Sequence, residues 1–181
     1  QAVALDPDNV RAHYDLGMIL LRQGQLEEAG RHVTEALTRM PAEGLDRQYS
    51  CVQLHLDYGE ALLLAYRLPE AKLHLARVLE LEPTNAQAHC WLARVLASLG
   101  DMEAALQHHT QAMTLDPSVD DSPWLHHVLA EYLCQKHQFL AAVRHEERAL
   151  AMAQAARDDN LAARLKKTLE YYRRLEQAAR R

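Results

Sequence analysis

Histidine is the residue type in this chain most suited to chemistry, because eleven of the 181 residues are histidines. Eight of them form two series, and each member of the second follows one of the first by 19 residues: His13, His55, His89 and His126, then His32, His74, His108 and His145. A metal needs its ligands around one centre. The repeat described below predicts a stack of helix pairs, and equivalent positions in successive pairs lie roughly 10 Å apart. No His-x-x-x-His sequence is present either. We therefore expect histidines that pack, with no metal site and no cofactor.

Acidic residues could supply acid–base catalysis only if two carboxyl groups faced a common substrate. The acidic pairs are adjacent in sequence, and the helical pattern around them indicates solvated faces: Glu27-Glu28, Glu146-Glu147 and Asp158-Asp159. The chain also lacks a glycine-rich phosphate loop, a nucleophile elbow and a dinucleotide fingerprint. The sequence therefore predicts a protein that is not an enzyme.

The cysteines indicate a reducing environment. Cys51, Cys90 and Cys134 lie far apart and form no Cys-x-x-Cys pair, which argues against a zinc site. An odd number of scattered thiols is typical of proteins from a reducing compartment. We therefore expect unreactive cysteines in a cytoplasmic protein.

The composition is typical of a helical globular chain. Apolar residues make up 49% and charged residues 25%, with only 6 Gly and 6 Pro. No apolar run approaches the ~18 residues that a membrane span needs. From Leu161 onward there are seven basic and two acidic residues, whereas the body before it has 13 basic and 23 acidic residues. The acidic body argues against a nucleic-acid partner.

The elements that would position these side chains repeat along the chain. Similar stretches run from one helical pattern through an acidic residue followed by a proline into the next: ALDPDNVRAHYDLG (4–17), ELEPTNAQAHCWLA (80–93) and TLDPSVDDSPWLHHVLA (114–130). They define blocks of 34 residues at 10–43, 52–85 and 86–119, and a degenerate block at 123–156. Small residues share two registers in all four blocks: Gly17, Gly59, Ala93 and Ala130, then Ala29, Ala71, Ala105 and Ala142. Helices about 8–10 Å apart need small residues where they meet, so we expect Gly17 to face Ala29.

This period and pattern resemble the tetratricopeptide repeat, a helix-turn-helix unit of the same length. The resemblance implies one all-α domain over residues 1–181, a right-handed α-solenoid of antiparallel helix pairs with a C-terminal capping helix at 160–180. Residues 1–9 would be the tail of a preceding repeat. Residues 44–51 form an insertion, which we expect to lengthen the next helix by about two turns with Asp46 as its N-cap.

Three local features depart from the repeat pattern or refine it. The turn after each first helix favours glycine in the left-handed conformation, and that place is held by Gly24, Tyr66, Gly100 and His137. Ser122 is expected to cap the helix that begins at Pro123. His109 and Glu146 stand where the family has a buried apolar residue.

The resemblance also implies that a partner binds the concave surface, which the first helix of each repeat lines. The family's contact positions are occupied here by Arg11, Tyr14, Asp15, Met18, Arg22, Gln53, Asp57, Glu60, Leu64, Gln87, Trp91, Arg94, Trp124, His127 and Glu131. The family's carboxylate clamp and its asparagine ladder are both absent from these positions. Aromatic residues and arginine remain as anchors, and these types often dominate binding. The alternative for any of them, Trp91 especially, is packing between neighbouring helices.

Three functions are open at this point. The first is a non-enzymatic scaffold or adaptor that binds a peptide or protein segment in the groove. The second is a substrate-recruiting or assembly arm of a larger multidomain enzyme, such as a glycosyl- or sulfo-transferase. The third is self-association through the half-repeat at residues 1–9.

Overall fold

All regular secondary structure in the described part of the chain is helical. The computed structural model describes residues 6, 8–41, 50–119 and 122–181. These residues form nine α-helices and no strand: α2 Val10–Arg22, α3 Leu26–Arg39, α4 Cys51–Leu64, α5 Leu68–Leu81, α6 Ala86–Ser98, α7 Met102–Leu115, α8 Pro123–Gln135, α9 Phe139–Ala155 and α10 Asp159–Ala179. The predicted all-α class is confirmed.

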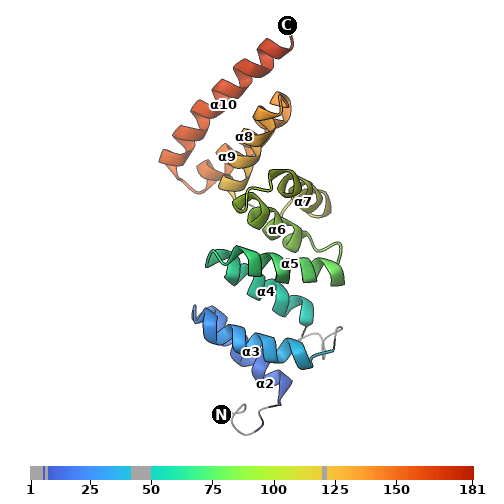
Figure 1. Cartoon of the computed structure of the whole chain (residues 1–181). Helices are drawn as coiled ribbons and strands as arrows, with labels where there is room; N and C mark the ends of the chain where they lie inside the picture. The colour runs from blue at the N-terminus through green and yellow to red at the C-terminus, as the bar shows by residue number, and fades with distance from the viewer. Residues whose placement is uncertain (1–5, 7, 42–49, 120–121) are drawn as a thin grey trace.

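The helices form pairs that stack along the chain. Helices α2 and α3, α4 and α5, α6 and α7, and α8 and α9 pack together, and α5 also packs against α6. Figure 1 shows the pairs rising in order from the N-terminal to the C-terminal end, with α10 along the last pair. This is the expected solenoid, although the exact repeat boundaries stay a prediction.

Short polar residues cap the N-termini of several helices. The side chain of Asn9 accepts a hydrogen bond from the backbone N–H of Ala12 at 2.9 Å, which satisfies one of the unpaired donors at the start of α2. Asn85 does the same at the start of α6. Ser122 caps α8, whose first residue is Pro123, so the predicted start of that helix is confirmed.

The turn after each first helix has one residue in the left-handed region. The φ angles are 72° at Gly24, 58° at Tyr66, 85° at Gly100 and 59° at His137. The expectation drawn from the two glycines is therefore confirmed, and two residues with side chains adopt the same conformation. For such residues the left-handed region costs roughly 1–2 kcal/mol.

The contact at the small residues differs in detail from the expectation. A Cβ atom placed on Gly17 would meet the side chain of Val33 at 3.1 Å, and its nearest neighbours do not include Ala29. Gly59 lies against Leu75 in the same way. Side chains on a helix tilt toward its N-terminus, so the residue one turn after Ala29 covers the crossing point. Ala29 is nevertheless fully buried.

The insertion does not extend α4 as expected. This helix begins at Cys51, and the side chain of Ser50 accepts a hydrogen bond from the backbone N–H of Gln53. Asp46 is therefore not its N-cap, because a serine much nearer the helix already fills that role. Residues 42–49, with Asp46, lie outside the described residues, as do 1–5, 7 and 120–121.

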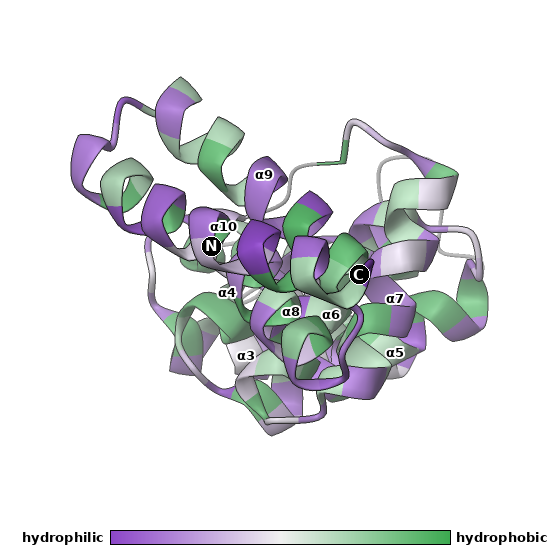
Figure 2. Cartoon of the chain, turned by 90° about the horizontal axis from the view of Figure 1, so that it is seen from above, coloured by the Kyte–Doolittle hydropathy of each residue, from purple (hydrophilic) through white to green (hydrophobic). Residues whose placement is uncertain are grey.

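Helix α10 covers the last pair with an apolar stripe. Leu169 and Tyr172 are buried against residues of α8 and α9, and Leu165 packs on Ala149 and Ala153 of α9. Figure 2 shows hydrophobic and hydrophilic residues on different faces of the helices. No helix in the part of the chain that the structure describes is long and apolar enough to cross a bilayer.

Candidate functional site

Two hollows lie side by side along the first helices of the pairs. One, which we call the Arg94 pocket, has a volume of about 240 Å³ and is lined by Leu63, Leu64, Tyr66, Leu68, Arg94, Ser98, Ser122 and Trp124. The other, the Asp57 pocket, has a volume of about 360 Å³ and is lined by Met18, Leu21, Arg22, Asp57, Glu60, Ala61 and Leu64. The exposed side chain of Leu64 belongs to both, so the two pockets form one groove across α2, α4, α6 and the start of α8.

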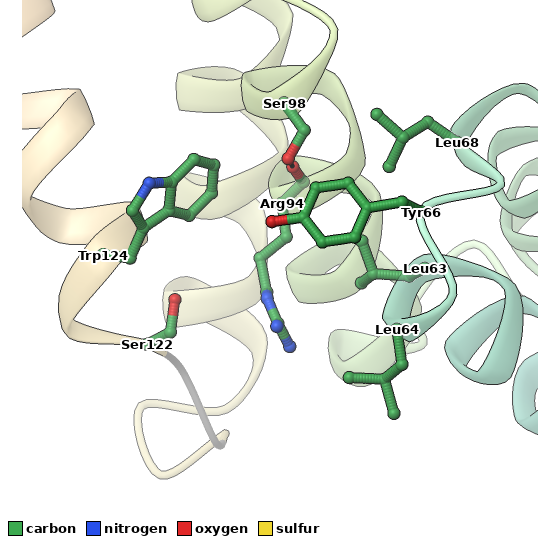
Figure 3. A pocket seen from close by; sticks show the side chains of 8 residues that line it. All are labelled: Leu63, Leu64, Tyr66, Leu68, Arg94, Ser98, Ser122 and Trp124. Atoms are coloured by element: carbon green, nitrogen blue, oxygen red, sulfur yellow. Dashed lines mark hydrogen bonds between the residues drawn. The ribbon is translucent and has the colours of Figure 1, made fainter.

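The Arg94 pocket combines a cation with two exposed aromatic rings. In Figure 3, Tyr66 and Trp124 enter from opposite sides, with Arg94 and Ser98 between them. Tyr66 is 82% exposed and Trp124 is 46% exposed. Arg94 is half-buried, and no carboxylate among the described residues forms an ion pair with it. The pocket therefore offers apolar walls and an available guanidinium.

The turn that carries Tyr66 is held by its neighbour Arg67. The guanidinium of Arg67 donates to Glu70 at 2.5 and 2.7 Å and to Glu27 of the preceding helix pair at 2.7 Å. These bonds join two helix pairs directly beside Tyr66. The exposed ring is thus carried by a braced segment of backbone.

The Asp57 pocket has charges of both signs. Asp57 accepts a hydrogen bond of 2.7 Å from the side-chain amide of Gln53. Burial raises the pKa of Asp57, while the bond from Gln53 and the charge of Arg22 act in the opposite direction. Because Arg22 and Glu60 line the same hollow, this end of the groove suits a polar or charged group of a partner.

A second set of polar contacts joins the two helices of each pair. The Nδ1 atoms of two histidines face each other at 2.9 Å for His13–His32, 2.8 Å for His55–His74, 2.8 Å for His89–His108 and 3.1 Å for His126–His145. The expectation from the sequence concerned equivalent histidines of different blocks, and it did not include this pairing within each block. The constant spacing of 19 residues was the signal. Among the described residues, no three histidine, cysteine or acidic side chains are placed to hold a metal ion.

The expectation that the acidic pair Glu146-Glu147 faces solvent is wrong for Glu146. Its side chain is fully buried, and both carboxylate oxygens lie within 3.1 Å of Nδ1 of His127. The hydrogen bond to Glu146 raises the pKa of His127. Burial raises the pKa of Tyr172, and the nearby Glu146 adds to the effect. Glu147, the second member, is exposed and bonds to Arg173, as expected.

Comparison with known proteins shows which repeat and which fold the chain resembles. A model described as tetratricopeptide repeat matches residues 1–31 and 74–107. Solved structures of tetratricopeptide-repeat proteins have the same fold: YrrB covers 92% of this chain and 78% of its own at a TM-score of 0.67 and 21% identity. The chain therefore has the fold of tetratricopeptide-repeat proteins. The structure of MamA is also similar, with a TM-score of 0.67, 17% identity and coverage of 87% of this chain and 85% of its own.

The curated relatives are much longer proteins. Over 105 residues, or 58% of this chain, the repeats are 31% identical to the human protein O-mannosyl-transferase TMTC2, of which they span 12%. Over 115 residues, or 63% of this chain, they are 28% identical to U-box domain-containing protein 70 of Oryza sativa subsp. japonica, of which they span 13%.

The groove brings together about half of the contact residues expected from the sequence. Those that line the two pockets are Met18, Arg22, Asp57, Glu60, Leu64, Arg94 and Trp124. Gln53 supports Asp57 from the same helix. Outside both pockets, Arg11, Asp15 and Glu131 are exposed, Gln87 is half-buried and His127 bonds to Glu146.

Two of the expected anchors lie in the core instead. Tyr14 is 6% exposed and Trp91 is 9% exposed, and both belong to the largest hydrophobic cluster. Their rings fill the space between stacked helices, because large apolar side chains gain most from complete burial. They leave little surface for a partner.

Sequence reasoning missed Tyr66, Leu68 and Ser122 as pocket residues. All three lie outside the first-helix positions at which the family makes its contacts. Tyr66 did carry a signal, since an aromatic residue at a turn that favours glycine is uncommon.

The three cysteines are free thiols, and burial raises the pKa of Cys134.

Proposed function

We propose that this chain is a non-enzymatic protein-interaction module that binds a peptide or protein segment along the groove. The helix-pair solenoid supports the proposal, because it places the first helices side by side and leaves two adjoining hollows between them. Binding modules of this kind need exposed anchors rather than reactive groups. The free thiols and the acidic body suit a cytoplasmic protein partner rather than a nucleic acid.

The observation that carries the proposal is Arg94 between the exposed rings of Tyr66 and Trp124. Arginine, tyrosine and tryptophan are the types most often dominant at interfaces. A guanidinium binds a carboxylate through two parallel hydrogen bonds, and the aromatic walls would cover an apolar side chain beside it. The preferred segment therefore has an acidic group next to an aromatic or aliphatic residue.

One similar solved structure supports the peptide class. YrrB is described as a tetratricopeptide-repeat protein with an unusual peptide-binding site. At 21% identity that likeness concerns the fold, so the chemistry of the segment proposed here rests on the residues of this groove.

Selection of peptides from a random displayed library on the immobilised chain tests the proposal. Selected peptides should contain an acidic residue beside an apolar one. Arg94→Ala should weaken their binding about tenfold or more, the loss of one charge-assisted pair. Arg174→Ala, an exposed arginine on α10, is the matched control. Equal binding by wild type and Arg94→Ala would rule out the groove assignment.

The second candidate is a recruiting or assembly arm of a larger enzyme. The match to a protein O-mannosyl-transferase over 105 residues favours this candidate, because repeats of this kind occur there beside a named transferase activity. Extending the reading frame in both directions distinguishes the two. A catalytic domain in the same frame would support the arm, and its absence would favour the separate adaptor.

Self-association through residues 1–9 is a third, independent proposal. Sedimentation of the chain at several concentrations tests it: a dimer that dissociates on deletion of these residues would support it. A monomer at every concentration would rule it out.

A further inference from the structure

The four histidine pairs have one geometry in four successive helix pairs. The first histidine of each pair lies on the first helix and the second lies on the second helix, with Nδ1 atoms 2.8–3.1 Å apart. We infer that these pairs form a set of acid-sensitive locks. At neutral pH each pair joins its two helices by one N–H···N hydrogen bond between the rings. This bond survives the uptake of one further proton and is broken by the uptake of a second. Acid would then loosen all four helix pairs, in an order set by the charged groups around each pair.

The pair His89–His108 shows how the protons are arranged. Nε2 of His89 lies 3.1 Å from the carbonyl oxygen of Pro83. A carbonyl only accepts, so this Nε2 carries the proton and, in a neutral ring, Nδ1 of His89 has none. The bond between the rings at 2.8 Å therefore has His108 as donor and His89 as acceptor, and it fixes His108 in the tautomer protonated at Nδ1.

The two added protons have opposite effects on this pair. The first enters at Nε2 of His108, leaves the bond intact and makes it charge-assisted, which strengthens it. The second can enter only at Nδ1 of His89, and it removes the acceptor and places two cations at hydrogen-bond distance. The pair thus tolerates one added proton and is broken by two. The same count applies to the other three pairs, since each also has two facing Nδ1 atoms and one proton between them.

The geometry favours a proton over a metal ion between the rings. Ring centroids are 5.0 Å apart in the first two pairs, 5.1 Å in the third and 5.2 Å in the fourth. For a given Nδ1···Nδ1 distance, the centroid separation is largest when both nitrogens lie on the line between the two centroids. The observed separations are close to that maximum, so the two nitrogens point at each other along one line. A tetrahedral or square-planar metal would require both lone pairs to point at a common centre off that line.

Burial makes the second protonation costly. The first histidine is almost fully buried in three pairs, at 6% exposure for His13 and His89 and 3% for His126. In the remaining pair, burial and the charge of His74 lower the pKa of His55 to about 4. Water therefore cannot stabilise two imidazolium ions well at these positions.

The charged groups around the first two pairs are mixed in sign. Glu28 and Arg31 act on the pair His13–His32. Around His55–His74 the groups are Glu70, Arg77 and Glu80, and the ring of Tyr58 packs edge-on against His74 at 4.8 Å. Carboxylates near these two pairs partly offset the added charge.

The other two pairs face more positive surroundings. Lys72 of the neighbouring helix pair acts on His108. The rings of His126 and His145 lie 4.8 and 5.3 Å from that of His109. Arg144 lines the same hollow of about 310 Å³, and the ion pair His127–Glu146 lies one residue further along both helices. We therefore expect the His89–His108 lock, with a lysine beside it, to open first as the pH falls.

Side-chain NMR of the intact chain tests the tautomers directly. At pH 7.5 in the presence of a chelator, each pair should show one ring protonated at Nδ1 and one protonated at Nε2. His108 should be the Nδ1–H ring and His89 the Nε2–H ring. Eight histidines that are all protonated at Nε2 and titrate independently near their ordinary pKa would overturn the inference.

Proton uptake on unfolding tests the consequence. At pH 5.5 each unfolded histidine is mostly protonated, whereas a folded pair holds at most one added proton, so unfolding should take up about one proton or more per pair. His89→Asn together with His108→Asn should lower this uptake by about one proton. His137→Asn is the matched control, because it is exposed, lies outside the pairs and occupies a left-handed position that asparagine tolerates. An uptake unchanged by the double variant would contradict the locks.

Discussion

Nδ1 of His127 on α8 lies 3.0 Å from Oε2 of Glu146 on α9, and this carboxylate is completely removed from solvent. In the first two helix pairs the position equivalent to Glu146 is held by the buried apolar residues Val33 and Leu75. We expect His127→Ala to lower the free energy of unfolding by about 2–3 kcal/mol, because it leaves a buried carboxylate without its cation. Chemical denaturation at pH 6 measures the loss.

A second substitution shows whether the loss comes from the stranded charge. Adding Glu146→Leu to His127→Ala should recover most of the stability, since an apolar side chain needs no partner there. The matched control is Glu147→Leu added to His127→Ala, which changes the exposed neighbour and should recover nothing. A double variant as unstable as the single one would contradict this account.

Tyr66 has an exposed ring and a strained backbone conformation. One substitution at this position should therefore change the stability of the chain and its peptide binding in opposite directions. Tyr66→Gly should raise the free energy of unfolding by about 0.5–1 kcal/mol, the relief of the left-handed strain less the added entropy of the unfolded glycine. The same change removes one wall of the Arg94 pocket. Binding of groove peptides should therefore weaken while the chain becomes more stable.

His137→Gly is the matched control for that prediction. His137 has the same backbone conformation as Tyr66, with φ 59° against 58°, but does not line the groove. It should gain similar stability and bind the peptides as the wild type does. If Tyr66→Gly keeps full affinity, the ring is not part of the binding site.

Features fixed by local sequence could be predicted, and features fixed by side-chain pairing across helices could not. The left-handed turn at Gly24 and the cap at Ser122 depend on a few neighbouring residues, so the sequence predicts them correctly. The pair His55–His74 depends on how two helices meet, and no propensity of either segment contains that information. Burial of Glu146 on α9 likewise follows from the packing of this helix against α8 and α10, which carry His127 and Tyr172.

The groove shows the same division. Positions on the first helices, such as Arg94 and Leu64, follow from the repeat register, and the structure places them in pockets. Tyr14 and Trp91 share that register but are core residues. The register gives the direction of a side chain around its helix, but it does not tell how closely the neighbouring helix pair packs over that side chain. Tyr66 reaches the pocket from a turn, outside any register.

Close packing of the helix pairs predicts a sharp response to size at the buried alanines. Ala71 and Ala105 are fully buried, and replacing either by leucine should cost on the order of 1–3 kcal/mol by overpacking. Ala151→Leu, an exposed position on α9, should change stability little. Thermal unfolding compares the three, and unchanged melting of both buried variants would contradict the assigned contact positions.

Stability should pass through a maximum with pH. Burial lowers the pKa of His32, His74 and His108, and that of His55 to about 4. The unfolded chain then binds more protons than the folded one, so this contribution is complete above about pH 6.5 and is lost as the pH falls toward 4.

His127 has the opposite sign, because Glu146 raises its pKa. Its contribution is complete below about pH 6.5 and is lost as the pH rises through the raised pKa. Urea denaturation from pH 4 to 9 in the presence of a chelator should therefore show a decline on both sides of neutrality. His127→Ala should remove part of the alkaline decline and leave the acid decline in place, because the two arise from different groups. A variant that loses both together would show that the histidine pairs and the ion pair titrate as one unit.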